Sequence, residues 1–316
     1  MSKSTPEKPL NLTNIKNTLN EQFQIGATAV ELFVRGINYT FKITCRTKKY
    51  YFKVFSTSRT VTDISFEISV THTLLNNNIG VARIVKSIHG HSFIKIRLAD
   101  EDRLGILYND VEGRPLLNNA TDISLFSAAI AKIHGLPTLE LSQCTSRIFC
   151  IEKECSRLQG LLKNNTLAPK TLILKMIENC NSIQDEALRD CNVLSHGDAW
   201  LGNARLTNER VYFIDLEDAV LADRHFDLGV MAYHLIAKHC EVSGCIASLL
   251  QRYNNLSPTR VTLRTLKPYI QLRSLFVFCL LLENDLISEQ LLPRLIERAD
   301  YFTSEAFSTQ IAHVNE

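Results

Sequence analysis

The chain of 316 residues has 45% hydrophobic and 22% charged residues and a formal net charge of +2, the balance of a globular protein large enough for two domains or two lobes. The near-neutral charge excludes the strongly basic composition typical of proteins whose main partner is nucleic acid or an anionic membrane. The nine cysteines include no Cys-x-x-Cys pair, which favours scattered reduced thiols over a zinc site.

The N-terminal segment MSKSTPEKPLNLTN is polar and lacks the apolar core of a signal peptide. The longest uncharged apolar run, SLFVFCLLL at 274–282, is well short of the ~20 residues that a membrane-spanning helix needs. These two features predict a cytoplasmic protein without a membrane partner.

The first part of the chain predicts a helix followed by a small sheet. The segment NLTNIKNTLNEQF has apolar residues at three- and four-residue steps, which indicates an amphipathic helix. Three β-rich runs follow at about 29–35, 39–45 and 50–55. The polar segment RTKK between the last two predicts a hairpin.

The remaining elements predict a second, mostly helical part. TDISFEISVTHTLLNNNIG predicts a helix that ends near Gly80, and HSFIKIRL and RLGILYNDV predict two more strands. From Thr121 the chain is mostly helical, except for loop and short strands at 193–214. VEGRPL at 111–116, with its Gly and Pro, is the predicted connection between the two parts. We therefore expect an α+β fold, with a small antiparallel sheet and one main helix in residues 1–110 and a larger helical part in residues 111–316.

The loop-and-strand region carries the residues with the clearest chemistry. SHGDAWLGN places Asp198 and Asn203 in one loop, and the apolar strand VYFI ends at Asp215. A carboxylate and an amide oxygen are hard ligands that suit Mg²⁺, which also takes phosphate oxygens and water. One further acid that receives a proton completes a minimal site for phosphoryl transfer.

The combination HGDAWLGN, FIDLEDA and DRHFDLG resembles the aminoglycoside phosphotransferase and choline kinase family. The positions that match this family's motif are His196, Gly197, Asp198, Asn203, Ile214, Asp215, Asp227 and Leu228. The resemblance implies the two-lobed fold of the protein kinases. It assigns nucleotide binding to an N-terminal lobe at 1–110, and the catalytic loop and acceptor site to a C-terminal lobe at 111–316.

The resemblance also implies roles for the loop residues. Asp198 would accept the acceptor hydroxyl's proton or orient the hydroxyl, and Asn203 and Asp215 would hold Mg²⁺. His196 and Asp227 would support the catalytic loop, with Asp227 accepting backbone N–H groups. An isolated His-Gly-Asp would be better explained as a turn, so the assignment depends on the whole set of motifs.

Two residues of the N-terminal half resemble the family's phosphate-binding ion pair. YYFKVF places Lys53 where the third-strand lysine contacts the α- and β-phosphates, and Glu67 in the next helix is its implied partner. By itself Lys53 would be a solvated strand lysine. Glu217 is either a further metal oxygen or a solvated acid, and the sequence leaves both open.

Two short segments resemble the turn and the hinge around the nucleotide. Gly36 and Asn38 match the hairpin turn that covers the phosphates, and the backbone at Asn109 and Val111 matches the hinge that reads adenine. The chain has no Gly-x-Gly-x-x-Gly, so a single Gly turn would hold the phosphates, and it has no Gly-Lys dipeptide, which excludes a Walker A loop. IDLEDA stands in place of the Asp-Phe-Gly of protein kinases.

These residues predict a kinase that transfers the γ-phosphate of ATP, with Mg²⁺, to a hydroxyl of a small molecule such as an aminoglycoside, an amino alcohol or a sugar. GTP is an alternative nucleotide. A protein Ser/Thr kinase of the stress-response type is a second hypothesis, and an inactive nucleotide-binding pseudokinase is a third. The presence of Lys53, Asp198, Asn203 and Asp215 argues against the third.

The acceptor and the oligomeric state stay open at this point. The last part of the chain carries many acids, which would favour a cationic acceptor if they lined the cleft and would otherwise form a solvated face. These acids are Glu283, Asp285, Glu289, Glu297, Asp300 and Glu305. Trp200 replaces a smaller or polar residue of relatives, and we expect it to pack rather than to stack on the acceptor.

Overall fold

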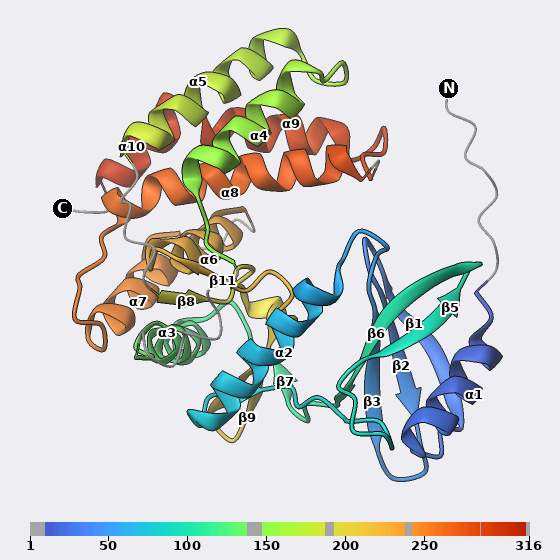
Figure 1. The fold of residues 1–316 in the computed structure, drawn as a ribbon. Helices are drawn as coiled ribbons and strands as arrows, with labels where there is room; N and C mark the ends of the chain where they lie inside the picture. Colours follow the sequence, from blue (N-terminus) through green and yellow to red (C-terminus); the bar gives the residue numbers. More distant parts are fainter. Residues whose placement is uncertain (1–9, 138–146, 187–192, 238–241, 285, 314–316) are drawn as a thin grey trace. The chain divides into compact units, whose positions relative to one another are not determined.

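The computed structural model describes residues 10–137, 147–186, 193–237, 242–284 and 286–313. The chain divides into two compact units (Figure 1). The first unit comprises Met1–Leu75 and Val81–Glu112, and the second comprises Asn76–Gly80 and Gly113–Glu316.

The first unit is built on a five-stranded antiparallel sheet with the strand order β1-β2-β3-β6-β5. Its strands are β1 (Ala29–Arg35), β2 (Tyr39–Thr44), β3 (Lys49–Val54), β5 (Ile94–Leu98) and β6 (Glu101–Asn109). Burial alternates along β5, where Ile94, Ile96 and Leu98 are buried and the residues between them are exposed. This alternation is typical of a sheet with one face on the core and the other in solvent.

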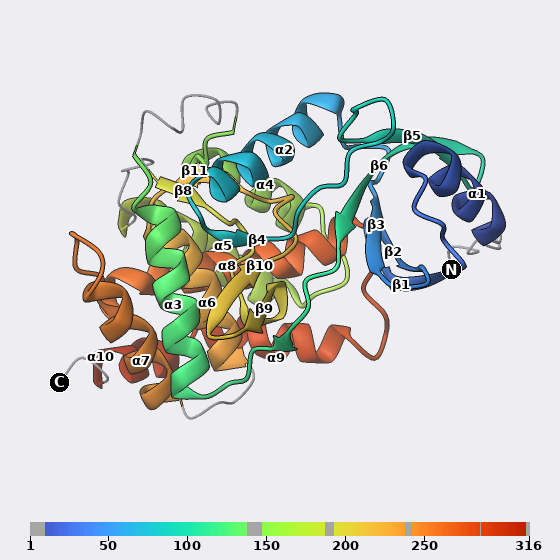
Figure 2. The same cartoon turned by 90° about the horizontal axis from the view of Figure 1, so that it is seen from below.

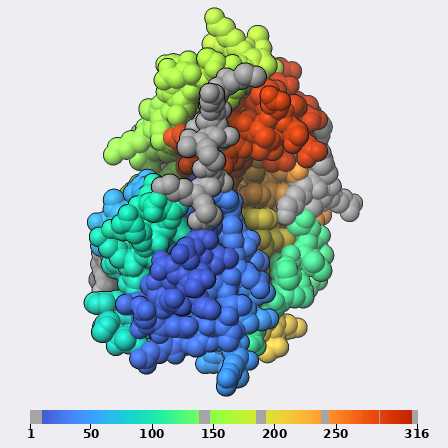
Figure 3. All heavy atoms as spheres, turned by 90° about the vertical axis from the view of Figure 1, so that its right-hand side faces the viewer, coloured from blue at the N-terminus to red at the C-terminus, as the bar shows by residue number. Residues whose placement is uncertain are grey.

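Two helices complete the first unit, α1 (Leu12–Phe23) and α2 (Val61–Asn76). The chain enters α1 at Asn11, whose side-chain oxygen accepts the backbone N–H of Asn14 at 2.9 Å and so caps the helix. Ile15, Leu19 and Phe23 form its buried face and share a core with the strands. Figure 3 shows α1, in dark blue, at the surface of this unit.

The second unit contains two small sheets and most of the helices. One sheet has the order β4-β10-β9-β7, and the other is the antiparallel pair of β11 and β8. The strands are β4 (Gly80–Val81), whose second residue begins a segment of the first unit, β7 (Arg114–Pro115), β8 (Val193–Ser195), β9 (Ala204–Thr207), β10 (Arg210–Phe213) and β11 (Val220–Ala222). The helices are α3 (Ala120–His134), α4 (Ile151–Lys163), α5 (Lys170–Glu186), the 3-10 turn η2 (Leu201–Asn203), α6 (His225–Ala237), α7 (Val242–Asn254), α8 (Leu263–Glu283), α9 (Leu292–Phe302) and α10 (Glu305–His313).

Helix α8 is the central helix of the second unit. It lies between α6 on one side and the α4 and α5 pair on the other (Figure 1). Leu158 of α4, Met176 of α5 and Leu275 of α8 are buried in the core that these helices share. Seen from below, α3 runs along α7 (Figure 2), where Ser127 Oγ donates to the backbone carbonyl of Leu249 at 2.6 Å.

By length and composition α8 could cross a membrane, since it has 21 residues and a mean hydropathy of 1.3 over its most apolar window. Of that window 56% is buried inside the structure. The core helix of a globular protein meets the same criteria. The length and composition of α8 are therefore weak evidence for a membrane span.

The predicted fold class is confirmed, because an antiparallel-sheet unit precedes a mostly helical one. The predicted strands of the first unit coincide with β1, β2, β3, β5 and β6 to within one or a few residues. The short strands β4, β7 and β11 were not predicted. The six cysteines described in the structure are free thiols, whereas Cys144, Cys191 and Cys240 lie outside the described residues.

Candidate active site

The loop that carries Asp198 follows β8 and lies close to the segment before β11. Strands β8 and β11 pair with Ser195 opposite Val220. Gly197 has a φ of +85°, and a Cβ added there would meet the backbone oxygen of Asp218 at 1.8 Å. Both the left-handed backbone and this close approach require glycine. Gly197 therefore allows the loop to run directly against the chain that precedes β11.

Asp198 and Asn203 are in direct contact. The amide nitrogen of Asn203 donates to the Asp198 carboxylate oxygen Oδ2 at 2.7 Å and to the Asp198 main-chain oxygen at 3.0 Å. Because the amide nitrogen makes both bonds, the side-chain oxygen of Asn203 is left as an acceptor for another group. The η2 turn positions Asn203, whose backbone N–H donates to the carbonyl of Trp200 at 2.9 Å.

Asp215 follows β10 next to the same loop. The backbone N–H of Ile214 donates to the carbonyl of Asn203 at 3.0 Å, and His196 Nε2 lies 3.1 Å from the carbonyl of Ile214. Asp215 has a φ of 64°, a conformation that is uncommon for residues other than glycine and is found at functional sites. Its side chain is exposed. Asp198, Asn203 and Asp215 therefore come from one continuous hydrogen-bonded region.

Asp227 supports the start of this loop from α6. Its carboxylate accepts the backbone N–H of His196 at 2.7 Å and that of Gly197 at 3.0 Å. The Asp227 side chain is fully buried. A buried carboxylate that receives several N–H groups holds the backbone around it in one conformation.

His134 of α3 is the third partner of Asp227. His134 Nε2 lies 3.1 Å from the Asp227 carboxylate, and Nδ1 lies 2.8 Å from the Tyr253 hydroxyl. Burial raises the pKa of Asp227, but the hydrogen bond and charge of His134, together with His196, outweigh burial and hold that pKa below its ordinary value. An ionised Asp227 can only accept, so His134 Nε2 must be the donor.

Other acids near the loop are differently placed. Glu217 is half-buried, and its carbonyl accepts a hydrogen bond from Arg147 at 2.5 Å. The segment DRHFD leads into α6 at His225, and Asp223 accepts the His225 backbone N–H at 2.7 Å. Among the described residues no group of three His, Cys, Asp or Glu side chains could hold a metal ion.

Lys53 and Glu67 are both buried in the first unit, with 7% and 2% of their surfaces exposed. Lys53 lies in β3 between Thr40 of β2 and Ile106 of β6. Glu67 lies in α2 and accepts the hydroxyl of Tyr108 at 2.5 Å. Buried charges are costly unless they are compensated. The burial of Lys53 therefore favours a functional role over that of a solvated strand lysine. Their pairing stays a prediction.

The predicted turn and hinge residues also lie in the first unit. The backbone N–H of Gly36 donates to the carbonyl of Asn38 at 3.0 Å, and the Asn38 side chain accepts the Ser56 N–H at 2.8 Å. The N–H of Asn109 donates to the carbonyl of Arg83. Val111 follows two residues later, at the end of the first unit. Asn38 thus shapes the turn with its side chain, and the Asn109 N–H is already used within the unit.

A comparison with protein families places these motifs. The model of the phosphotransferase enzyme family matches residues 34–263. The match covers well over half of the chain and includes every predicted site residue. The chain belongs to this family.

Several solved structures with a similar fold are phosphotransferases or kinases by description. An amicoumacin kinase in complex with AMP-PNP, Ca²⁺ and Ami has a TM-score of 0.76 at 16% identity, over 93% of each chain. A spectinomycin phosphotransferase with ADP and spectinomycin has a TM-score of 0.71 at 14% identity, over 96% of this chain and 100% of that chain. A microcompartment-associated aminopropanol kinase has a TM-score of 0.67 at 16% identity, over 95% and 98%. No curated protein sequence matches.

The predicted family and enzyme class are confirmed by these comparisons. The protein is a phosphotransferase of this family. The structural neighbours are below 25% identity and so establish the fold that this phosphotransferase shares with them.

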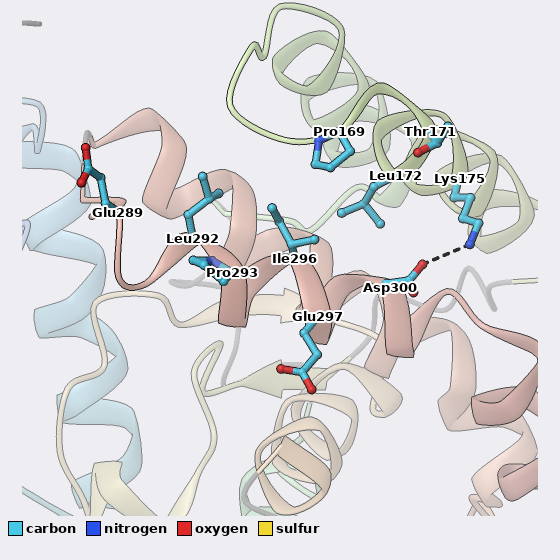
Figure 4. Close-up of a pocket in the computed structure, with 10 residues that line it drawn as sticks. All are labelled: Pro169, Thr171, Leu172, Lys175, Glu289, Leu292, Pro293, Ile296, Glu297 and Asp300. Carbon is cyan, nitrogen blue, oxygen red and sulfur yellow. Dashed lines mark hydrogen bonds and ion pairs between the residues drawn. The ribbon is translucent and has the colours of Figure 1, made fainter.

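The acids of the last helices that the structure describes have different surroundings in this phosphotransferase. Glu283 pairs with Arg157, and Asp300 pairs with Lys175 at 3.0 Å. Glu289, Glu297 and Asp300 line a cavity of about 740 Å³ between α5 and α9, where Glu289 and Glu297 point away from each other (Figure 4). None of the residues lining this cavity belongs to the catalytic loop. Asp285 lies outside the described residues.

Two side chains next to the catalytic loop were not predicted to act there. Arg273 of α8 forms an ion pair with Asp198, and His134 of α3 contacts Asp227. The only sequence signal for Arg273 is a charge inside an apolar helix. Trp200 stacks on the ring of His234, with ring centroids 4.8 Å apart and planes at 19°, which is a packing contact within the second unit.

Proposed function

We propose that the protein transfers the γ-phosphate of ATP, with Mg²⁺, to the hydroxyl of a small molecule. In this proposal Asp198 orients the hydroxyl and receives its proton, as the loop acids of phosphoryl-transfer sites do. The observation that carries the proposal is the contact between Asp198 and Asn203 beside the chain that leads to Asp215. It supports one site for acceptor and metal rather than two separate turns.

The donor set of Asn203 and Asp215 fits Mg²⁺. The Asn203 amide nitrogen is engaged with Asp198, so its oxygen can ligate, and the Asp215 carboxylate is exposed at a constrained backbone position. Two oxygen ligands from protein, completed by water and phosphate, are typical of Mg²⁺. Bound there, Mg²⁺ would offset the negative charge of the phosphates. Glu217 is half-buried and we assign it no ligand role.

For the nucleotide we propose contacts in the first unit. Lys53 would pair with the α- and β-phosphates, and Glu67 would orient Lys53. The burial of both residues supports this assignment. Gly36 and Asn38 would cover the phosphates, and the backbone at Asn109 and Val111 would read the adenine. The Asn109 N–H already donates to the carbonyl of Arg83.

For the acceptor we propose a hydroxyl compound of the size of an amino alcohol or a small antibiotic. The support is the fold shared with the amicoumacin, spectinomycin and aminopropanol kinases. The acids of the last helices do not add support for a cationic acceptor, because Glu283 and Asp300 are already paired with Arg157 and Lys175.

The test is transfer of label from radioactive ATP to a panel of acceptors, in the presence of Mg²⁺. The panel contains ethanolamine, choline, aminopropanol and spectinomycin, with casein and histones as protein acceptors. We expect labelling of a small alcohol. Labelling of proteins alone would instead support a protein kinase, and absence of any ATP turnover would support an inactive nucleotide-binding protein.

The residue-level test is Asp198→Ala. We expect loss of transfer with nucleotide binding preserved, because Asp198 acts on the acceptor and not on ATP. Glu178→Ala is the matched control, since Glu178 is an exposed acid on α5. Wild-type transfer by Asp198→Ala would refute the assignment of Asp198 as the catalytic base.

A further inference from the structure

Asp198, the catalytic base of the proposed function, is contacted by a residue from a distant part of the chain. Arg273 in the middle of α8 forms an ion pair with Asp198, its guanidinium contacting the carboxylate oxygen Oδ1. The two side chains are mostly buried, with 15% and 23% of their surfaces exposed. A charge-assisted pair with so little solvent is stronger and better defined than a surface pair.

Arg273 is held in place by the helix that carries it. Its neighbours Leu272, Ser274 and Leu275 are all buried, with 1%, 5% and 1% exposed. Helix α8 begins with a capping box in which Thr262 and Thr265 satisfy each other's backbone N–H groups. The guanidinium is therefore presented from a packed helix rather than from a loop.

Among the residues that the structure describes, Arg273 forms its ion pair with Asp198. The Nε atom of Arg273 is buried and has no hydrogen-bond partner in the described part of the chain. A buried guanidinium whose charge is offset by one carboxylate resists rearrangement, because leaving that carboxylate would strand the charge.

Both carboxylate oxygens of Asp198 are thus engaged. Arg273 contacts Oδ1, and the Asn203 amide donates to Oδ2 at 2.7 Å. A carboxylate has about four lone-pair sites, so two N–H donors fix its orientation and leave room for the acceptor hydroxyl. Donors from α8 and from the loop's own end define the plane of the carboxylate.

We propose that Arg273 is a positioning residue for the phosphotransferase reaction, which orients Asp198 towards the acceptor hydroxyl. The role rests on the proposed function of Asp198. Arg273 touches neither nucleotide nor metal ligand in this scheme and acts through the carboxylate. Misplacement of a catalytic group by about 1 Å can lower a rate by ~10²-fold, which sets the expected effect.

The test measures label transfer from ATP to whichever panel alcohol the wild-type protein uses best, or to water if it uses none. We expect Arg273→Met to lower kcat by ~10²-fold with the KM for ATP unchanged. The kcat of Arg273→Lys should lie between those of the wild type and Arg273→Met. Guanidinium ion added to Arg273→Ala should restore part of kcat. Arg264→Met, at an exposed arginine on the same helix, should retain wild-type kcat.

A second background separates positioning from folding. In Asp198→Asn, adding Arg273→Met should cause little further loss of kcat, because the acid to be oriented is already gone. An equal loss in both backgrounds, or a wild-type kcat in folded Arg273→Met and Arg273→Lys, would overturn the role of Arg273 alone. A wild-type protein that turns over no ATP, with any acceptor or water, would overturn the proposed function as well.

Discussion

The catalytic loop and the β1–β2 hairpin are built in opposite ways. In the loop, Asp198, Asn203 and the backbone at 196–197 are all tied by hydrogen bonds to neighbouring elements. In the hairpin, Leu32, Phe33 and Val34 are 37%, 53% and 49% exposed, and the pairing of β1 with β2 is irregular between Leu32 and Val34. The loop is held by hydrogen bonds from the protein itself, whereas the hairpin presents apolar surface that a ligand can cover.

This difference predicts which kinetic parameter each region controls. Groups that are already oriented contribute to the transition state and so to kcat. Apolar surface that becomes covered on binding contributes to affinity and so to KM. Changes in the loop's supports should therefore be large and affect stability or kcat, whereas changes in the hairpin should be small and affect the nucleotide KM.

The largest effect is expected for Asp227→Ala. It would leave the N–H groups of His196 and Gly197 and the Nε2 of His134 without their acceptor. Breaking a buried charged network of this kind costs about 3–5 kcal/mol of unfolding free energy. Urea denaturation measures it. Asp300→Ala is the control, since its ion pair with Lys175 is exposed and is worth under about 1 kcal/mol.

The same carboxylate predicts a pH dependence. Because the pKa of Asp227 is lowered on folding, its contribution is complete above its unfolded pKa of about 3.9 and is lost as the pH falls through the folded value. The stability difference between wild type and Asp227→Asn should therefore be larger at pH 7 than at pH 3. A difference that grew on acidification would contradict a lowered pKa.

Lys53→Met should follow in size. Removing a donor that offsets developing charge on the phosphates lowers kcat by ~10²–10³-fold. Methionine keeps the apolar stem, but the thermal midpoint should also fall, because the buried Glu67 would lose the charge that we propose compensates it. Lys49→Met, at an exposed lysine on the same strand, should leave kcat unchanged. Wild-type transfer by folded Lys53→Met would remove Lys53 from the proposed site.

The fold of the first unit is predictable because its elements have clear periods. Strands β1 to β3 each have six or seven residues, long enough to show an alternating or β-rich pattern. Strands β4 and β11 have two and three residues. No period exists at that length, so their pairing is decided by tertiary contacts.

The contact of Asp198 with Asn203 is predictable for a different reason, since only four residues separate them in the sequence and the motif fixes their spacing. The partners supplied by other helices are not. Arg273 is 75 residues from Asp198 and His134 is 93 residues from Asp227. Their position follows from how α3 and α8 pack in the second unit, which no local pattern encodes.

Gly197→Ala should have a smaller effect than the loss of Asp227. The added Cβ would clash with the Asp218 backbone oxygen at a φ of +85°, which costs about 1–3 kcal/mol through overpacking and backbone strain. Both the unfolding free energy and kcat should fall. Gly160→Ala is the matched control, since this helical glycine has nothing within 4 Å of the added Cβ and should gain about 0.5–1 kcal/mol.

The smallest effect is expected for Phe33→Ser at the hairpin. Phe33 is 53% exposed and contacts Tyr51 edge-on, with ring centroids 5.2 Å apart, so little is lost on folding and the thermal midpoint should hold. If this surface covers the nucleotide, the KM for ATP should rise several-fold, which corresponds to about 1 kcal/mol of binding free energy. The kcat should stay within about twofold of the wild-type value. Leu256→Ser, at a similarly exposed apolar residue after α7, should change neither parameter. A fall in kcat without a change in KM would show instead that the hairpin, like the loop, acts on the transition state.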